Sequence, residues 1–183
     1  ISSGVERPHE RIDSSFGLGQ HLNVITDLQL ARMLRDSGPS QGLVIRPYDG
    51  EIPAVVAFVQ TYQSAPSSMH AAALCLGINE AILVQRKLPQ LDVEIFANDL
   101  KEFQDKHAAA LKGLKKIQIN EAMVSGIEAL ENQHLELAIS TNGKESKKVF
   151  DLVVLMTQPQ LSSEVKKGSK DLDLNLNYAS FLA

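Results

Sequence analysis

The segment from residue 52 to residue 99 reads IPAVVAFVQTYQSAPSSMHAAALCLGINEAILVQRKLPQLDVEIFAND, and it decides the fold. Its apolar run at 54–59 is typical of a strand buried on both faces, and the run at 93–97 is expected to be the parallel partner of that strand. The stretch between them, 69–87, predicts a crossover helix that ends before Pro89. Together these elements form a βαβ unit, the arrangement on which dinucleotides are usually held.

The bend between the first strand and the helix lacks the residues that a dinucleotide site needs. Residues 60–68 read QTYQSAPSS, and none of them is glycine. A dinucleotide-binding turn uses glycines so that backbone amides can approach a pyrophosphate closely. The sequence therefore predicts a nucleotide-binding fold without its binding turn, in which Ser67 or Ser68 serves as the N-cap of the helix.

Composition excludes several classes of protein. The chain has 183 residues, of which 44% are hydrophobic and 22% charged, so it can bury a substantial core. A net charge of -4 argues against nucleic acid as the main partner. The single cysteine, Cys75, excludes a multi-thiolate zinc site or an iron–sulfur cluster held by this chain alone. No apolar run approaches ~20 residues, so we expect no transmembrane segment and a cytoplasmic location.

The part of the chain before residue 52 predicts one helix and a linker. Residues 5–24 are polar and read as a surface connection. The pattern from Thr26 to Gln29 is a capping box, and the helix that it opens is expected to stop at Gly38. The segment 37–53 is rich in glycine and proline, which favours a linker and a domain boundary.

The part after residue 97 predicts alternating elements that complete an α/β fold. Asn98 or Asp99 is expected to cap a further helix. The Asn-Gly pair at 142–143 predicts a two-residue hairpin turn. In order, we expect a helix to Lys112, a strand at 116–120, meander strands at 124–130 and 135–140, and an apolar strand at 148–156 that returns to the parallel sheet, followed by a weakly patterned tail at 157–183.

This order of elements is similar to the plan of the nucleotide-binding domains of flavin-dependent disulfide reductases, and specific words carry a closer resemblance. The chain resembles the A subunit of heterodisulfide reductase and its relative, the A subunit of the quinone-interacting membrane-bound oxidoreductase complex. The words lie in the family's order and spacing: NVITDLQLARMLRDSGP (23–39), IRPYDGEIPAVVAFVQ (45–60), NEAILVQRKLP (79–89), VEIFANDLKEF (93–103) and FDLVVLMT (150–157). The implied fold is a Rossmann-like FAD/NAD(P)-binding domain with a central parallel sheet and a three-stranded β-meander.

The resemblance also implies a domain organisation and a cofactor. Proteins of this family are FAD-carrying subunits of electron-transfer complexes. The resemblance divides the chain into three parts: a partial FAD-domain segment with a linker (1–50), an NAD(P)-binding-like domain (51–157) and a return segment towards the FAD domain (158–183). Ser3 and Gly4 look like the end of an FAD-domain strand and are the expected cofactor-binding residues. The glycine-rich FAD loop would then precede residue 1, and FAD would belong to the longer parent rather than to this piece.

The chain departs from the family where many members hold a metal cluster in this domain. By the flanking matches, Thr61, Met69, Ala73 and Leu74 stand in the positions of the cluster's cysteines, and Cys75 lies one residue beyond them. None of those four side chains supplies a thiolate. We therefore expect no iron–sulfur cluster, a loss that favours the quinone-interacting relative.

Four further side chains have a functional and a plainer interpretation. Cys75 is most simply a small buried residue on an apolar helix face rather than a redox group. His70 could line the vacated cleft or be only a solvent-facing or N-terminal polar residue of the helix. His107 is expected to pack as part of a helix face rather than bind a ligand. Tyr62, expected to be exposed at the bend, could contact a partner, stack on a ligand or be an ordinary loop tyrosine.

Asn98 and Asp99 stand where a ribose-binding carboxylate is expected, but capping is the simpler interpretation. No catalytic residue and no metal site emerge from the spacing of the polar residues. The sequence thus favours a scaffold domain of an electron-transfer subunit, with other subunits as its partners and any membrane association made through them. Two alternatives remain: an NAD(P)H-binding domain that uses amides at the start of the helix, and a module that only docks proteins.

Overall fold

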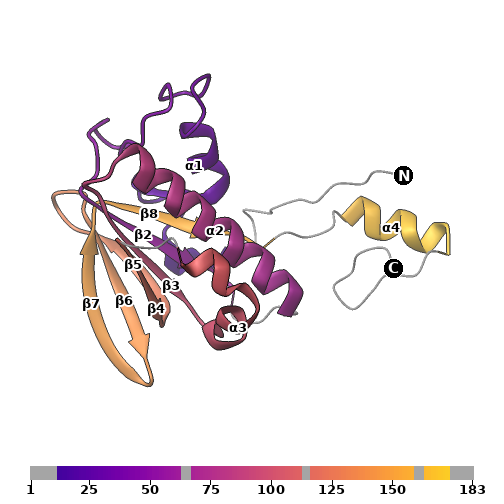
Figure 1. Cartoon of the computed structure of the whole chain (residues 1–183). Coiled ribbons are helices and arrows are strands. Elements are labelled where there is room, and N and C mark those ends of the chain that lie inside the picture. Colours follow the sequence, from indigo (N-terminus) through magenta and orange to yellow (C-terminus); the bar gives the residue numbers. More distant parts are fainter. Residues whose placement is uncertain (1–11, 63–66, 113–115, 159–162, 174–183) are drawn as a thin grey trace.

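A five-stranded parallel sheet forms the centre of the molecule. The structure is a computed structural model and describes residues 12–62, 67–112, 116–158 and 163–173 (Figure 1). The strand order is β1-β8-β2-β3-β4, and every neighbouring pair is parallel. The strands are β1 (Val24–Thr26), β2 (Val55–Gln60), β3 (Asp92–Ala97), β4 (Ile117–Glu121) and β8 (Leu152–Met156).

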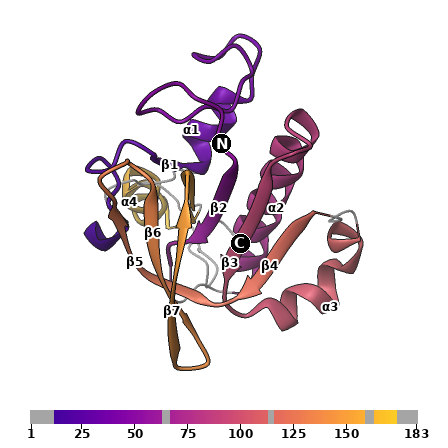
Figure 2. The same ribbon diagram turned by 90° about the vertical axis from the view of Figure 1, so that its left-hand side faces the viewer.

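A second sheet lies on one face of this parallel sheet, and the helices α1 (Asp27–Met33), α2 (Ser67–Lys87) and α3 (Leu100–Leu111) lie on the other (Figure 2). The second sheet is an antiparallel meander of β5 (Met123–Ala129), β6 (Leu135–Thr141) and β7 (Lys144–Phe150). A further helix, α4 (Ser163–Asp171), and a short 3-10 helix at Ser14–Phe16 are also present. Among the described residues, α4 lies apart from the sheet (Figure 1).

Each central strand is buried on both faces. Phe58 and Val154 pack into the core beneath the helices, whereas Val59 and Leu155 pack into the core beneath the meander. Successive side chains of a strand point to opposite faces, so strands with two covered faces need apolar residues at consecutive positions. The continuous apolar runs of the sequence are the consequence of this three-layer arrangement.

Most of the expected elements are confirmed. The βαβ unit, the strand at 116–120 and the three-stranded meander are all present. The capping box is also confirmed, because the Thr26 side chain accepts from the backbone amide of Gln29 and the Gln29 side chain accepts from that of Thr26. Asn142 and Gly143 both have positive φ, as the predicted hairpin turn requires.

Several boundaries were wrong. Helix α1 ends at Met33 rather than at Gly38, and α2 starts at Ser67, so both candidate capping serines lie inside the helix. Residues 24–26, assigned in part to a surface connection, form β1, which is too short to show a strand pattern. Helix α4 was not predicted in the weakly patterned tail.

The expected single strand at 148–156 is in fact two strands that meet at Asp151. The chain leaves the meander at Phe150 and enters the parallel sheet at Leu152. Asp151 makes this change of sheet possible: its backbone amide donates to the carbonyl oxygen of Val55, and its carboxylate accepts from the amides of Ala54 and Val55 at 2.6 and 3.1 Å. An apolar pattern does not reveal such a break, because both strands are apolar where they meet.

The parallel sheet includes residues on both sides of the boundary expected near residue 50, because β1 pairs with β8. The division of the chain into three parts stays a prediction. Ser3 and Gly4 lie outside the described residues. No helix in the described ranges has both the length and the apolar character needed to cross a bilayer.

Candidate functional site

The candidate site is the edge of the parallel sheet where β8, β2 and β3 end. From β2 the chain continues through α2 to β3 on one side, whereas β8 lies on the other side of β2. Ligands of open α/β sheets bind outside the carboxyl ends of the strands at such a switch point. The side chains found there therefore decide whether this fold can hold a nucleotide.

Gln60, the last residue of β2, closes the gap between the ends of β2 and β3. Its Nε2 donates to the carbonyl oxygen of Tyr62 at 2.7 Å and to Oδ1 of Asn98. The backbone amide of Asn98 donates to Oε1 of Gln60 at 3.2 Å. One carboxamide thus bonds to the chain after both strands, in the place where a dinucleotide fold leaves backbone amides open to a ligand.

Tyr62 packs against the first turns of α2. Its ring meets the His70 ring edge to face with 5.9 Å between centroids, and its hydroxyl lies 3.4 Å from His70 Nδ1. Burial raises the pKa of Tyr62, and the negative charge of Asp27 raises it further. The phenol is therefore neutral over the physiological range, and it packs against His70 with its hydroxyl also 3.5 Å from the His70 carbonyl oxygen.

His70 lies near the N-terminus of α2 but is buried, with 7% of its surface exposed, so the solvent-facing alternative was wrong. The reason is Tyr62, which covers the histidine from the chain segment before the helix. His70 Nε2 has no hydrogen-bond partner among the described residues.

A buried carboxylate connects the start of α1 to the end of β8. Asp27 is 2% exposed and accepts hydrogen bonds from the backbone amide and the hydroxyl of Thr157, at 3.1 Å and 2.8 Å. It also accepts from the backbone amide of Leu28 at 2.8 Å. Because Thr157 directly follows β8, this contact fixes α1 beside the switch point. Neither residue was singled out from the sequence, in which nothing distinguishes Asp27 from an ordinary acidic residue in a first helical turn.

The four residues in the family's cysteine positions do not fit an iron–sulfur cluster. Thr61 donates its hydroxyl to the carbonyl oxygen of Met156 at 2.9 Å. Ala73 and Leu74 are buried core residues, and the side chain of Met69 lies outside the described part of the structure. No group of three metal-binding side chains occurs in the described ranges.

Cys75 is partly buried and packs against the core beneath the helices, as its plainer interpretation predicted. Burial raises the pKa of its thiol. A protonated, partly covered thiol is a poor nucleophile and a poor metal ligand.

The contacts of Asn98 and Asp99, the residues in the ribose-binding position, differ from the expectation. Asn98 bonds to Gln60, while Asp99 takes the N-cap position of α3 in a left-handed conformation without a side-chain capping bond. The capping assignment therefore holds for the position of Asp99 but was wrong for its side chain. His107 lies in α3, and its side chain is outside the described part of the structure.

Sequence comparison finds similar proteins, although no protein-family model matches the chain. The A subunit of the H2:CoB-CoM heterodisulfide,ferredoxin reductase of Methanothermobacter thermautotrophicus is 32% identical over 178 residues, which cover 87% of this chain and 26% of that protein. The A subunit of the ferredoxin:CoB-CoM heterodisulfide reductase of Methanosarcina mazei is 25% identical, with 98% of this chain and 23% of that protein covered. The chain thus spans about a quarter of the length of these relatives.

Solved structures share the fold at low sequence identity. Thioredoxin reductase of T. acidophilum superposes with a TM-score of 0.54 at 13% identity, covering 98% of this chain and 49% of that one. L-lysine 6-monooxygenase of Pseudomonas syringae gives a TM-score of 0.52 at 10% identity with the same coverage. These likenesses establish a Rossmann-like fold of the FAD/NAD(P)-binding reductase type.

Proposed function

Because this chain is a sequence relative of the heterodisulfide reductase A subunits over most of its own length, we propose that it is the NAD(P)-binding-like domain of an FAD-dependent electron-transfer subunit. In this proposal the domain is a scaffold: it orders the complex beside the flavin and carries neither nucleotide nor cluster of its own. FAD belongs to the longer parent, whose partners are other subunits of a cytoplasmic complex. The parent is of the heterodisulfide reductase type or of the quinone-interacting type.

One observation carries the scaffold role: the Gln60 carboxamide fills the gap between the strand ends where a nucleotide would lie. In a dinucleotide fold the pyrophosphate lies at the N-terminus of the helix that follows the first strand. Beside that position Gln60 bonds to the chain after β3, where the amide of Asn98 donates to it. Tyr62 adds bulk over the start of α2. A nucleotide would have to break these contacts before binding, and the chain supplies no glycine there to let the backbone approach it.

Calorimetric titration of the purified chain with NADH and NADPH tests this role. We expect no binding with micromolar affinity. Micromolar binding would overturn the scaffold role in favour of the alternative, an NAD(P)H-binding domain that feeds electrons to the flavin.

A pair of variants makes the titration specific. Gln60→Ala/Tyr62→Ala removes the proposed obstruction. The control, Gln118→Ala, removes an exposed side-chain amide of β4, which donates to Asn120 of the same strand at 2.9 Å and lies away from the end of β2. The unmodified chain and both variants are compared after circular dichroism has established that each is folded. If the unmodified chain binds NADH and the double variant does not, the obstruction is instead a binding surface, and the proposal fails.

Iron analysis tests the absence of a cluster separately. Chain produced under anaerobic conditions with iron and sulfide present should hold less than stoichiometric iron and give no iron–sulfur signal in electron paramagnetic resonance. A stoichiometric signal that disappears in Cys75→Ser would contradict the expectation, because Cys75 is the one cysteine of the chain.

A further inference from the structure

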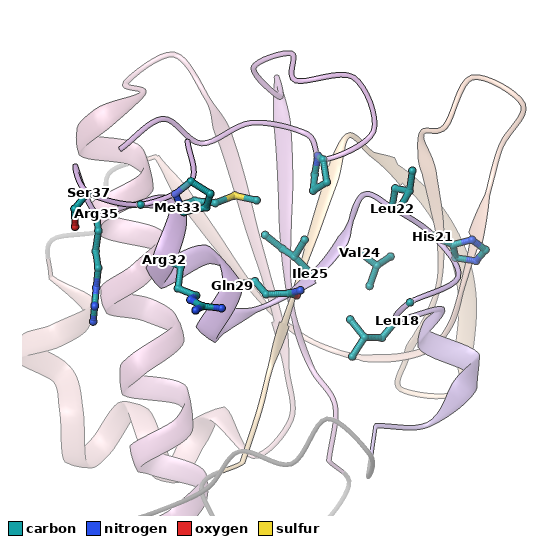
Figure 3. Close-up of a pocket in the computed structure, with 14 residues that line it drawn as sticks. Leu18, His21, Leu22, Val24, Ile25, Gln29, Arg32, Met33, Arg35 and Ser37 are labelled. Carbon is teal, nitrogen blue, oxygen red and sulfur yellow. The ribbon is translucent and has the colours of Figure 1, made fainter. Parts of the chain in front are cut away.

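A preformed groove lies beside β1, the edge strand of the parallel sheet, away from the strand ends described above. It has a volume of about 960 Å³ and is bounded by residues 18–25, the exposed side of α1 and the segment 35–47. Figure 3 shows apolar side chains, among them Leu22, Ile25 and Met33, around this space. Leu22 is 58% exposed at the groove, so the apolar surface continues outward from it.

Two arginines, Arg32 and Arg35, line the groove, and no Lys, Asp or Glu of the described residues lines it. Neither forms an ion pair within the described ranges. Two of the acidic side chains nearby in sequence are already paired, Asp36 with Lys87 at 3.5 Å and Asp49 with Arg46. A third, Asp27, does not line the groove and accepts hydrogen bonds from Thr157. In a chain of net charge -4, this groove is therefore a locally basic surface that an acidic group would complement.

The outer wall of the groove is fixed to the rest of the fold. The Ser40 hydroxyl donates to the carbonyl oxygen of Met33 at 3.2 Å and to that of Leu43 at 2.6 Å. Gly38 lies so close to the end of α1 that an added Cβ would be 1.9 Å from the Arg32 carbonyl oxygen. Because these contacts hold the groove open before anything binds, binding requires little further ordering of this chain, and the entropic cost of binding is lower.

A second bridge holds the wall at its other end. The Asn23 carboxamide accepts from the amide of Tyr48 at 3.1 Å and donates to the carbonyl oxygen of Gln133 in the meander at 3.0 Å. Tyr48 and Leu43 on this wall are 51% and 54% exposed. Together with Leu22 they extend the apolar surface beyond the groove. The combined apolar surface is larger than a small molecule would cover.

The occupant would not bind by adding a strand to β1. The amide of Val24 already donates to the carbonyl oxygen of His21 at 3.0 Å, and the amide of Thr26 donates to the side chain of Gln29 at 2.8 Å. With these edge donors occupied, recognition must come from side chains entering the groove.

From these observations we propose that the groove between β1, α1 and residues 35–47 docks a segment of a partner polypeptide that places apolar side chains in the groove and a carboxylate against Arg32 and Arg35. Arginines around an apolar centre are typical of protein interfaces, and an arginine can bind a carboxylate with two parallel hydrogen bonds. The proposal rests on the proposed function only in taking the chain to be part of a larger assembly.

Selection of random peptides displayed on phage against the immobilised whole chain tests the proposal. We expect the selected peptides to carry Asp or Glu close to Leu, Ile or Phe. Synthetic copies should bind Arg32→Glu/Arg35→Glu at least about ten times more weakly than the unmodified chain, as loss of a charge-assisted pair predicts. Leu22→Ser should also weaken binding, because it removes the exposed apolar side chain beside the groove.

The matched control is Lys144→Glu/Lys170→Glu, which makes the same change of net charge at exposed sites on β7 and α4. It should leave peptide affinity unchanged. Affinity that survives the arginine changes, selected peptides without carboxylates, or no selected peptide at all would each overturn the proposal. The proposal would also be overturned if native mass spectrometry found a small anionic molecule bound to the purified chain and not bound to the arginine variant. NADH binding would count against the scaffold role and would leave the peptide result intact.

Discussion

Single side chains make polar and packing contacts at the edge of the sheet where α/β folds hold their ligands. Gln60 uses its carboxamide to bond to the chain after both β2 and β3. Tyr62 and His70 pack together at the start of α2. Each contact is internal to the protein, so the polar groups that a ligand would otherwise use are occupied in stabilising the fold.

Tyr62 predicts a loss of stability at high pH. Burial raises its pKa, so above about pH 10, where an unfolded tyrosine ionises, the unfolded state loses a proton that the folded state keeps. Stability should then fall as pH rises. In urea unfolding between about pH 8 and pH 11, Tyr62→Phe should show a shallower fall than the unmodified chain. Tyr48→Phe, which changes an exposed tyrosine, is the control, and equal slopes for Tyr62→Phe and the unmodified chain would contradict the prediction.

Because Thr157 donates to the buried Asp27 carboxylate, we expect a substitution of Thr157 to destabilise the protein. Thr157→Val keeps the shape of the side chain but removes the hydroxyl that donates to Asp27 at 2.8 Å. A buried carboxylate with fewer donors should lower the free energy of unfolding by about 1–3 kcal/mol. Chemical denaturation at neutral pH measures this, with Thr141→Val at an exposed strand end as the control. Equal losses in both variants would mean that the buried contact is not stabilising.

At the scale of elements, the close approach of α2 to β8 depends on Gly77. A Cβ at this position would lie 2.2 Å from Sδ of Met156, a side chain that is 1% exposed. The helix can lie this near the sheet only because the glycine has no side chain. The same approach brings the first turn of α2 next to the ends of β2 and β8, where Tyr62 and Thr61 make their contacts.

Gly77→Ala should therefore destabilise the protein by about 1–3 kcal/mol through overpacking, although alanine is the better helix former. Gly168→Ala in α4 is the matched control, since nothing lies within 4 Å of a Cβ there, and it should be neutral or stabilising by up to about 1 kcal/mol. Thermal and urea unfolding compare the two. A neutral Gly77→Ala would show that Met156 moves aside without cost.

At the scale of the whole molecule, Asp151 joins the two sheets. Besides accepting from the amides before β2, its carboxylate pairs with Nδ1 of His134 in the meander at 2.9 Å. A further link is made by Lys148 of β7 and Glu94 of β3 at 2.8 Å. The meander is thus attached to the parallel sheet by named polar contacts as well as by the apolar core between them.

Asp151→Ala should loosen both sheets together. It leaves two backbone amides without their acceptor, which costs about 1–3 kcal/mol for each unsatisfied group. Hydrogen exchange measured by mass spectrometry should become faster at the start of β2 and at the turn before β6, with Asp105→Ala on the exposed side of α3 as the control. Faster exchange confined to one of the two sheets would contradict a joint role for Asp151.

The sequence by itself determined the elements that depend on patterns of consecutive residues. Apolar runs predicted the doubly covered strands, and Thr26 and Gln29 predicted a capping box. The absence of glycine at 60–68 predicts a fold without its binding turn, which the titration with NADH tests. The single cysteine also predicts that this chain alone does not hold an iron–sulfur cluster. These features are local, and local chemistry can be read along the chain.

Only the tertiary structure decided which polar residues meet at the edge where the parallel strands end. Gln60 and Asn98 are 38 residues apart, and Asp27 and Thr157 are 130 apart, so neither pair has a sequence signature. The same holds for β1, whose three residues become a strand because β8 lies beside them. Contacts between distant segments are made by the packing of the sheet, and no periodicity along the chain encodes them.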